Sequence, residues 1–87
     1  MTFSVRFEKQ PEKFLKRLDK KVQRRILKKL SLLKENPFPK GARKVFGFKD
    51  RVFRLRIGSY RALYVVDLKL KRIIISKIDK RERVYKS

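Results

Sequence analysis

The first apolar residues of the chain recur at every second position. Between residues 2 and 7, Phe3, Val5 and Phe7 alternate with polar residues. That alternation is typical of a β-strand with one buried face. The pattern therefore predicts an opening strand over residues 2–7 that directs three apolar side chains toward the core.

The apolar spacing then lengthens to three and four residues, which is the period of an amphipathic helix. Gln10-Pro11-Glu12 suits a helix start, with Pro11 at the first helical position and an acid near the positive end of the helix dipole. Asp19 can cap a second helical segment. We expect a helical hairpin or a bent helix that ends before Pro37. The expected core-facing positions are Phe14, Leu15, Leu18, Val22, Ile26, Leu27, Leu30 and Leu33.

Strand-forming residues return between residues 51 and 67, where two β-prone runs flank Gly58-Ser59. A glycine-containing turn between such runs favours a β-hairpin. Arg54 and Arg56 lie two positions apart on the first run, so their side chains should project from the same face. The hairpin then presents arginines from a sheet. The same alternation also fits the solvated outer face of an ordinary amphipathic strand.

A second turn over residues 67–71 precedes another β-prone run over residues 72–78, whose consecutive isoleucines indicate a central or doubly buried strand. Residues 40–50 are expected to form a basic connection. Within it, Phe46 and Phe48 are interpreted as core anchors, with base stacking as the alternative. The predicted fold is α+β in a single domain over residues 1–87: an N-terminal strand, a helical hairpin and a three-stranded antiparallel meander (βααβββ), with the helices on one face of the sheet.

Charge adds the first functional indication. The 87 residues carry 28 Lys and Arg against 8 Asp and Glu, a formal net charge of +20, which suits a polyanionic partner such as RNA, DNA or an acidic protein. Residues 11–34 alone hold ten basic and two acidic residues, so either a solvated face or a contact surface is expected there. No signal peptide, lipidation motif or long apolar segment is apparent, which indicates a cytoplasmic protein without a membrane partner.

The chain has neither cysteine nor histidine, which excludes thiolate metal sites and Ser-His or Cys-His nucleophiles. Its eight carboxylates are scattered and show no spacing typical of a two-metal nuclease. Any catalysis must therefore use Arg, Lys, Tyr or Ser, and no metal or cofactor is expected.

Two segments, residues 52–66 and 75–85, together with the basic helices, resemble the RelE family of messenger-RNA-cleaving toxins within the RelE/ParE superfamily. The resemblance spans nearly the whole chain. It implies a toxin of a type II toxin-antitoxin system that cleaves messenger RNA in the ribosomal A site and inhibits translation. It also implies inhibition by an acidic RelB-like antitoxin that wraps around the toxin.

The resemblance also implies roles for individual residues. Arg61 and Arg81 match active positions of the family, and because arginine donors suit developing phosphoryl charge, they are expected to stabilise the transition state. Tyr85 is the candidate for proton transfer or base stacking, unless it is a core-capping aromatic. Arginine stays protonated, so it can orient or stabilise charge but cannot act as a general base. The residues expected to hold substrate are Arg54, Arg56, Arg83 and Lys80.

Two other functions fit the same sequence. A ParE-like toxin would bind a protein target such as gyrase on this scaffold without cleaving RNA. A structural RNA-binding protein would need only the charge of +20 and a sheet with basic edges. Growth arrest on expression separates the toxins from the structural protein, and RNA cut sites separate the two kinds of toxin.

Overall fold

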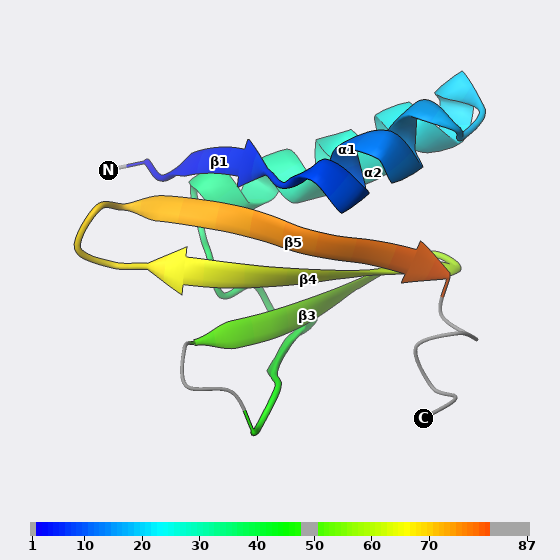
Figure 1. Ribbon diagram of the computed structural model, residues 1–87. Coiled ribbons are helices and arrows are strands. Elements are labelled where there is room, and N and C mark those ends of the chain that lie inside the picture. The colour runs from blue at the N-terminus through cyan, green and yellow to red at the C-terminus, as the bar shows by residue number, and fades with distance from the viewer. Residues whose placement is uncertain (1, 48–50, 81–87) are drawn as a thin grey trace.

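The computed structural model describes residues 2–47 and 51–80, which form a five-stranded sheet with helices on one face (Figure 1). The elements are β1 (Ser4–Phe7), α1 (Lys9–Lys16), α2 (Lys20–Ser31), the 3-10 helix η1 (Leu32–Lys34), β2 (Ala42–Lys44), β3 (Val52–Ile57), β4 (Tyr60–Asp67) and β5 (Arg72–Lys80). The strand order is β1-β5-β4-β3-β2, with β1 parallel to β5 and the other pairs antiparallel. The predicted α+β class, the two helices and the β3-β4-β5 meander are confirmed.

Strand β2 was not expected, because the sequence predicts a connection over residues 40–50. Its three residues pair with β3, with Ala42 opposite Leu55 and Arg43 opposite Arg54. Ala-Arg-Lys carries no alternating apolar pattern, so nothing local distinguishes it from a loop. Its strand conformation comes from hydrogen bonding to the edge of β3, which is a contact between distant segments.

Strand β5 lies between β1 and β4, as its run of isoleucines predicts, and Ile73 and Ile75 are fully buried. The pairing with β4 is interrupted: Leu63 is opposite Lys77, whereas Tyr64 is opposite Ile75. Ser76 is therefore an extra residue in β5, a β-bulge, and its Oγ donates a hydrogen bond to the Leu63 carbonyl (3.2 Å). The bulge shifts the inward-facing positions, so that Ile78 is buried instead of Lys77.

The helices contribute the buried residues Leu15, Ile26, Leu30 and Leu33 to one core with the strands. Three details differ from the sequence predictions. Helix α1 begins at Lys9, so Pro11 is its third residue instead of its first. Asp19 occupies the N-cap position of α2 without a side-chain capping bond, and Leu27 is 39% exposed instead of core-facing.

Gln10 joins the start of α1 to the end of β5. Its Nε2 donates to the Ile78 carbonyl and its Oε1 accepts from the Ile78 amide, both at 2.9 Å. The parallel ladder of β1 ends near Ile75, where the Glu8 amide donates to the Ile75 carbonyl. The Gln10 side chain therefore continues the hydrogen bonding along β5 beyond the last residue of β1.

Tyr64 anchors the segment that follows the helices. Its fully buried ring stacks on the Phe53 ring, with the two ring centroids 5.9 Å apart. Phe38 packs in turn against Phe53, with a centroid distance of 4.9 Å. The Tyr64 hydroxyl donates to the Pro37 carbonyl at 2.8 Å. Burial raises the pKa of this hydroxyl far above its ordinary value, so it remains a donor throughout the physiological range.

The Tyr64→Phe variant should be less stable by about 1–3 kcal/mol at neutral pH, because the Pro37 carbonyl loses its buried donor. The wild-type chain should also lose stability above pH ~10, where tyrosine in the unfolded state releases its proton and buried Tyr64 does not. Urea unfolding of both proteins between pH 7 and 11 measures both effects. Equal slopes of unfolding free energy against pH would contradict the role of Tyr64.

Candidate functional site

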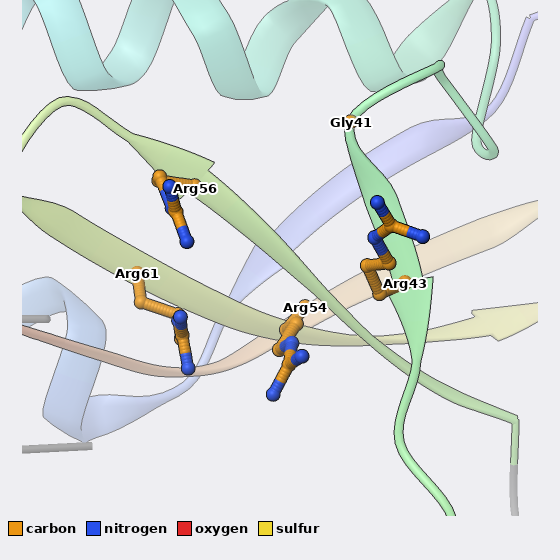
Figure 2. A pocket seen from close by; sticks show the side chains of 5 residues that line it. All are labelled: Gly41, Arg43, Arg54, Arg56 and Arg61. Carbon is orange, nitrogen blue, oxygen red and sulfur yellow. The ribbon is translucent and has the colours of Figure 1, made fainter. Parts of the chain in front are cut away.

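Three neighbouring strands present four arginines on the sheet face opposite the helices. Arg43 on β2 lies directly across from Arg54 on β3, and Arg56 on β3 lies directly across from Arg61 on β4. Directly opposite residues point to the same face of a sheet. Together with Gly41 they line a pocket of about 260 Å³, called here the arginine pocket (Figure 2).

Local sequence explains why the arginines meet. Leu55 and Ile57 alternate with Arg54 and Arg56, and burial of these apolar residues against the helices turns the arginines to the other face. The hairpin then sets the register. Gly58 adopts a φ of 60°, a conformation suited to the first central position of a type II′ turn, and the two-residue loop places Arg56 opposite Arg61.

The four side chains differ in exposure. Arg61 is 3% exposed, Arg54 is half-buried, and Arg43 and Arg56 are exposed. Four guanidinium groups around one cavity create a concentrated positive potential, which favours an anionic ligand. Planar arginine donors match phosphate oxygens in pairs. The pocket can therefore hold a phosphate and stabilise additional negative charge on it.

The structure brings together three of the residues predicted from the sequence, namely Arg54, Arg56 and Arg61. Lys80 does not join them, because it pairs with Tyr60 and strand alternation places it on the opposite face from Arg61. The other three candidates, Arg81, Arg83 and Tyr85, lie outside the described residues. Sequence reasoning missed Arg43, whose three-residue strand has no local signal.

Phe46 was interpreted as a core anchor, and this prediction is wrong. The side chain is 83% exposed and lies just beyond β2, where the Lys44 Nζ is 5.9 Å from the ring centroid. β2 is an edge strand, so only one neighbouring strand, β3, flanks it in the sheet. Phe48, the second predicted anchor, lies outside the described residues.

A second hollow of about 360 Å³, called here the basic groove, lies between α2 and β3. Its Arg56 also lines the arginine pocket, so the two cavities share this side chain. Leu32 at the groove is 57% exposed, which adds an apolar contact to a basic rim. The groove is lined by Arg25, Lys28, Lys29, Leu32, Arg56, Ile57 and Gly58.

Among residues 2–47 and 51–80, no helix is long and apolar enough to cross a membrane. The same residues contain no group of three or more side chains suited to holding a metal ion.

Comparison with known proteins identifies the family. A sequence model of the ParE toxin of type II toxin-antitoxin systems (parDE) matches residues 2–85. The chain belongs to this toxin family. The candidate toxin RelE1 of Methanocaldococcus jannaschii is 38% identical over 89 residues, which cover 100% of the chain and 99% of that protein. The RelE resemblance predicted from the sequence is confirmed.

Solved structures agree with this assignment. The toxin matches the archaeal RelE-RelB complex from Pyrococcus horikoshii OT3 with a TM-score of 0.83 and 37% identity, covering 95% of this chain and 99% of that one. It matches a double arginine-to-alanine mutant of E. coli RelE in the free state with a TM-score of 0.74 and 25% identity, covering 95% and 87%. The toxin therefore has the RelE fold over nearly its entire length.

Proposed function

We propose that this toxin is a metal-independent endoribonuclease that cuts messenger RNA in the ribosomal A site and thereby inhibits translation. The observation that carries the proposal is the arginine pocket, in which buried Arg61 on β4 lines the same cavity as three arginines from β2 and β3. Membership of the type II toxin family and similarity to RelE toxins support it. A structural RNA-binding role finds no such support.

Cleavage without a metal requires the ribose 2′-hydroxyl to lose a proton and attack the adjacent phosphorus. The 5′-oxygen then leaves while negative charge grows on the phosphoryl oxygens. Preorganised donors aimed at developing charge are often the largest catalytic contribution. In the proposed mechanism Arg61 stabilises this charge, Arg54 and Arg56 hold the substrate phosphate, and the geometry of the pocket adds Arg43 to them.

Three further roles come from the resemblance alone. Arg81 would assist Arg61, Arg83 would hold phosphate, and Tyr85 would stack on a base or transfer a proton. An arginine-based site has weak acid and base groups, so it depends strongly on correct positioning of the substrate. The ribosome supplies that positioning when it holds the messenger in an attack-ready conformation.

The proposal is tested by adding purified toxin to the same messenger, either free or bound to translating ribosomes, and mapping cut sites by primer extension. Cuts confined to the ribosome-bound messenger are expected. Comparable cutting of free RNA would contradict the ribosome requirement. If folded toxin makes no cuts in either form, the ParE-like alternative with a protein target replaces the ribonuclease.

The proposed inhibitor is a short, acidic, largely helical antitoxin, whose carboxylates would face the basic groove. An acidic amphipathic helix matches this surface, because Lys28 and Lys29 offer charge while Leu32 offers apolar contact. Since Arg56 lines both cavities, a segment bound in the groove would also contact a side chain of the arginine pocket. Antitoxin binding and substrate binding would then compete directly.

The paired charge reversal Lys28→Glu and Lys29→Glu should weaken antitoxin binding at least about tenfold, because like charges would face each other. Titration calorimetry with the cognate antitoxin measures the change. The matched control is Lys20→Glu with Lys21→Glu, the same charge change in the first turn of α2, outside the groove lining. Equal loss of affinity in both double variants would show that net charge, not the groove, determines binding.

A further inference from the structure

The bulge in β5 places one carboxylate on the sheet face that carries the four arginines of the pocket, called here the arginine face. Ile73 and Ile75 point into the core, so uninterrupted alternation would direct Asp79 into the core as well. The extra residue, Ser76, reverses the alternation, and Asp79 becomes the direct partner of Arg61. β-bulges often re-aim a side chain next to an active site.

Asp79 is not one of the residues that line the arginine pocket, but it lies directly opposite Arg61 on the next strand. Arg56, Arg61 and Asp79 form one row across β3, β4 and β5. Side chains directly opposite on neighbouring strands have Cβ atoms about 5 Å apart. A phosphate held by Arg61 would therefore have the carboxylate beside it, within reach of the adjoining ribose. No other carboxylate of the described residues pairs with an arginine of the pocket.

One hydrogen bond reaches the Asp79 carboxylate, and two others hold the backbone immediately before it. The Gln10 side chain holds the backbone of Ile78 through its amide and its carbonyl, immediately before Asp79. The Lys80 amide donates to the Asp79 Oδ1 at 2.8 Å. Within residues 2–47 and 51–80 this is the only hydrogen bond or ion pair of the Asp79 side chain, and the residue is half-buried. The second oxygen, Oδ2, can thus accept a proton.

We propose that Asp79 is the general base of the ribonuclease, an assignment that rests on the proposed function. It replaces Tyr85 as the proton acceptor and adds a carboxylate to the Arg, Lys, Tyr and Ser chemistry expected from the sequence. The arginines of the pocket cannot accept a proton, whereas a carboxylate can. The 2′-hydroxyl gives its proton to Asp79 while the 2′-oxygen bonds to phosphorus. The bond between phosphorus and the 5′-oxygen breaks, and that oxygen takes a proton from water. Protonated Asp79 then returns its proton to solvent, which leaves a 2′,3′-cyclic phosphate and a 5′-hydroxyl.

The test measures single-turnover cleavage of ribosome-bound messenger by Asp79→Asn, which keeps an oxygen for the Lys80 amide. Its rate should fall about 100-fold, a usual contribution of a general base, while ribosome affinity stays unchanged. The matched control is Asp67→Asn, an equal charge change at the far end of β4, which should cleave at the wild-type rate. Urea unfolding verifies that both variants are folded.

Chemical rescue distinguishes whether Asp79 acts as a general base or only neutralises the charge of Arg61. Cleavage by Asp79→Ala should recover with added formate or acetate, and the more basic carboxylate should restore more activity. If Asp79 only offsets charge, Asp79→Asn would bind ribosomes more tightly and cleave at the wild-type rate. That result would overturn the assignment, and so would a loss of cleavage activity in Asp79→Ala that does not recover with the basicity of the added carboxylate. In either case, cutting by the wild-type toxin would still support the ribonuclease. No cutting by folded wild-type toxin would overturn both.

Discussion

Replacing Arg61 with alanine is expected to lower the rate of messenger cleavage by about 100- to 1,000-fold, the usual effect of removing one preorganised donor to developing charge. Arg61 is the most buried arginine of the pocket, at 3% exposure, so water replaces its guanidinium poorly. Single-turnover cleavage of ribosome-bound messenger at saturating toxin measures the effect. At saturating toxin the measured rate reports the chemical step, so weaker binding of RNA does not contribute to the difference.

Two companion variants make this result specific. Arg61→Lys keeps the charge but loses the planar pair of donors, so its rate should lie between those of the wild type and Arg61→Ala. Arg24→Ala removes an equal charge from an exposed position of α2 and should leave the rate within about twofold. If folded Arg61→Ala cleaves at the wild-type rate, Arg61 does not stabilise the transition state.

Replacing Ile75 with alanine should reduce the free energy of unfolding by about 2–5 kcal/mol, because it leaves a cavity in the centre of the sheet. Ile75 is fully buried, and β5 joins the parallel strand β1 to the antiparallel meander at this point, with Phe7 and Tyr64 as its pairing partners. Domains are usually stable by only about 5–15 kcal/mol, so this substitution should remove a large share of the total stability.

Urea unfolding with the neighbouring variant Ile74→Ala as control tests this prediction. Ile74 is half-buried and points to the arginine face, so its truncation should cost less. A larger loss for Ile74→Ala than for Ile75→Ala would mean that the core lies on the other face of β5. The result therefore also tests which face carries the pocket.

Local patterns were sufficient for the hairpin and for the shared face of Arg54 and Arg56, because both features depend on neighbours in the sequence. Arg61 was identified from the family resemblance. The two-residue turn with Gly58 explains why it lies opposite Arg56. The helices followed from apolar periodicity, and the central position of β5 followed from its consecutive isoleucines.

Strand pairing between segments that are distant in the sequence could not be predicted from local patterns. Arg43 reaches the pocket because β2 adds to the edge of β3, and Asp79 reaches its row because a bulge shifts the register of β5 against β4. Neither event changes the local apolar pattern in a way that identifies it. Phe46 shows the opposite failure, since a large aromatic residue normally indicates burial but here stays exposed beside an edge strand.

The most direct test of the ribonuclease is end-group analysis of messenger RNA recovered from ribosomes that were incubated with pure toxin. Attack by the 2′-hydroxyl predicts new fragments with 2′,3′-cyclic phosphate and 5′-hydroxyl ends at the decoding site, and none with Arg61→Ala. Fragments with 5′-phosphate ends would contradict the mechanism. Intact messenger after incubation with folded wild-type toxin would contradict the function.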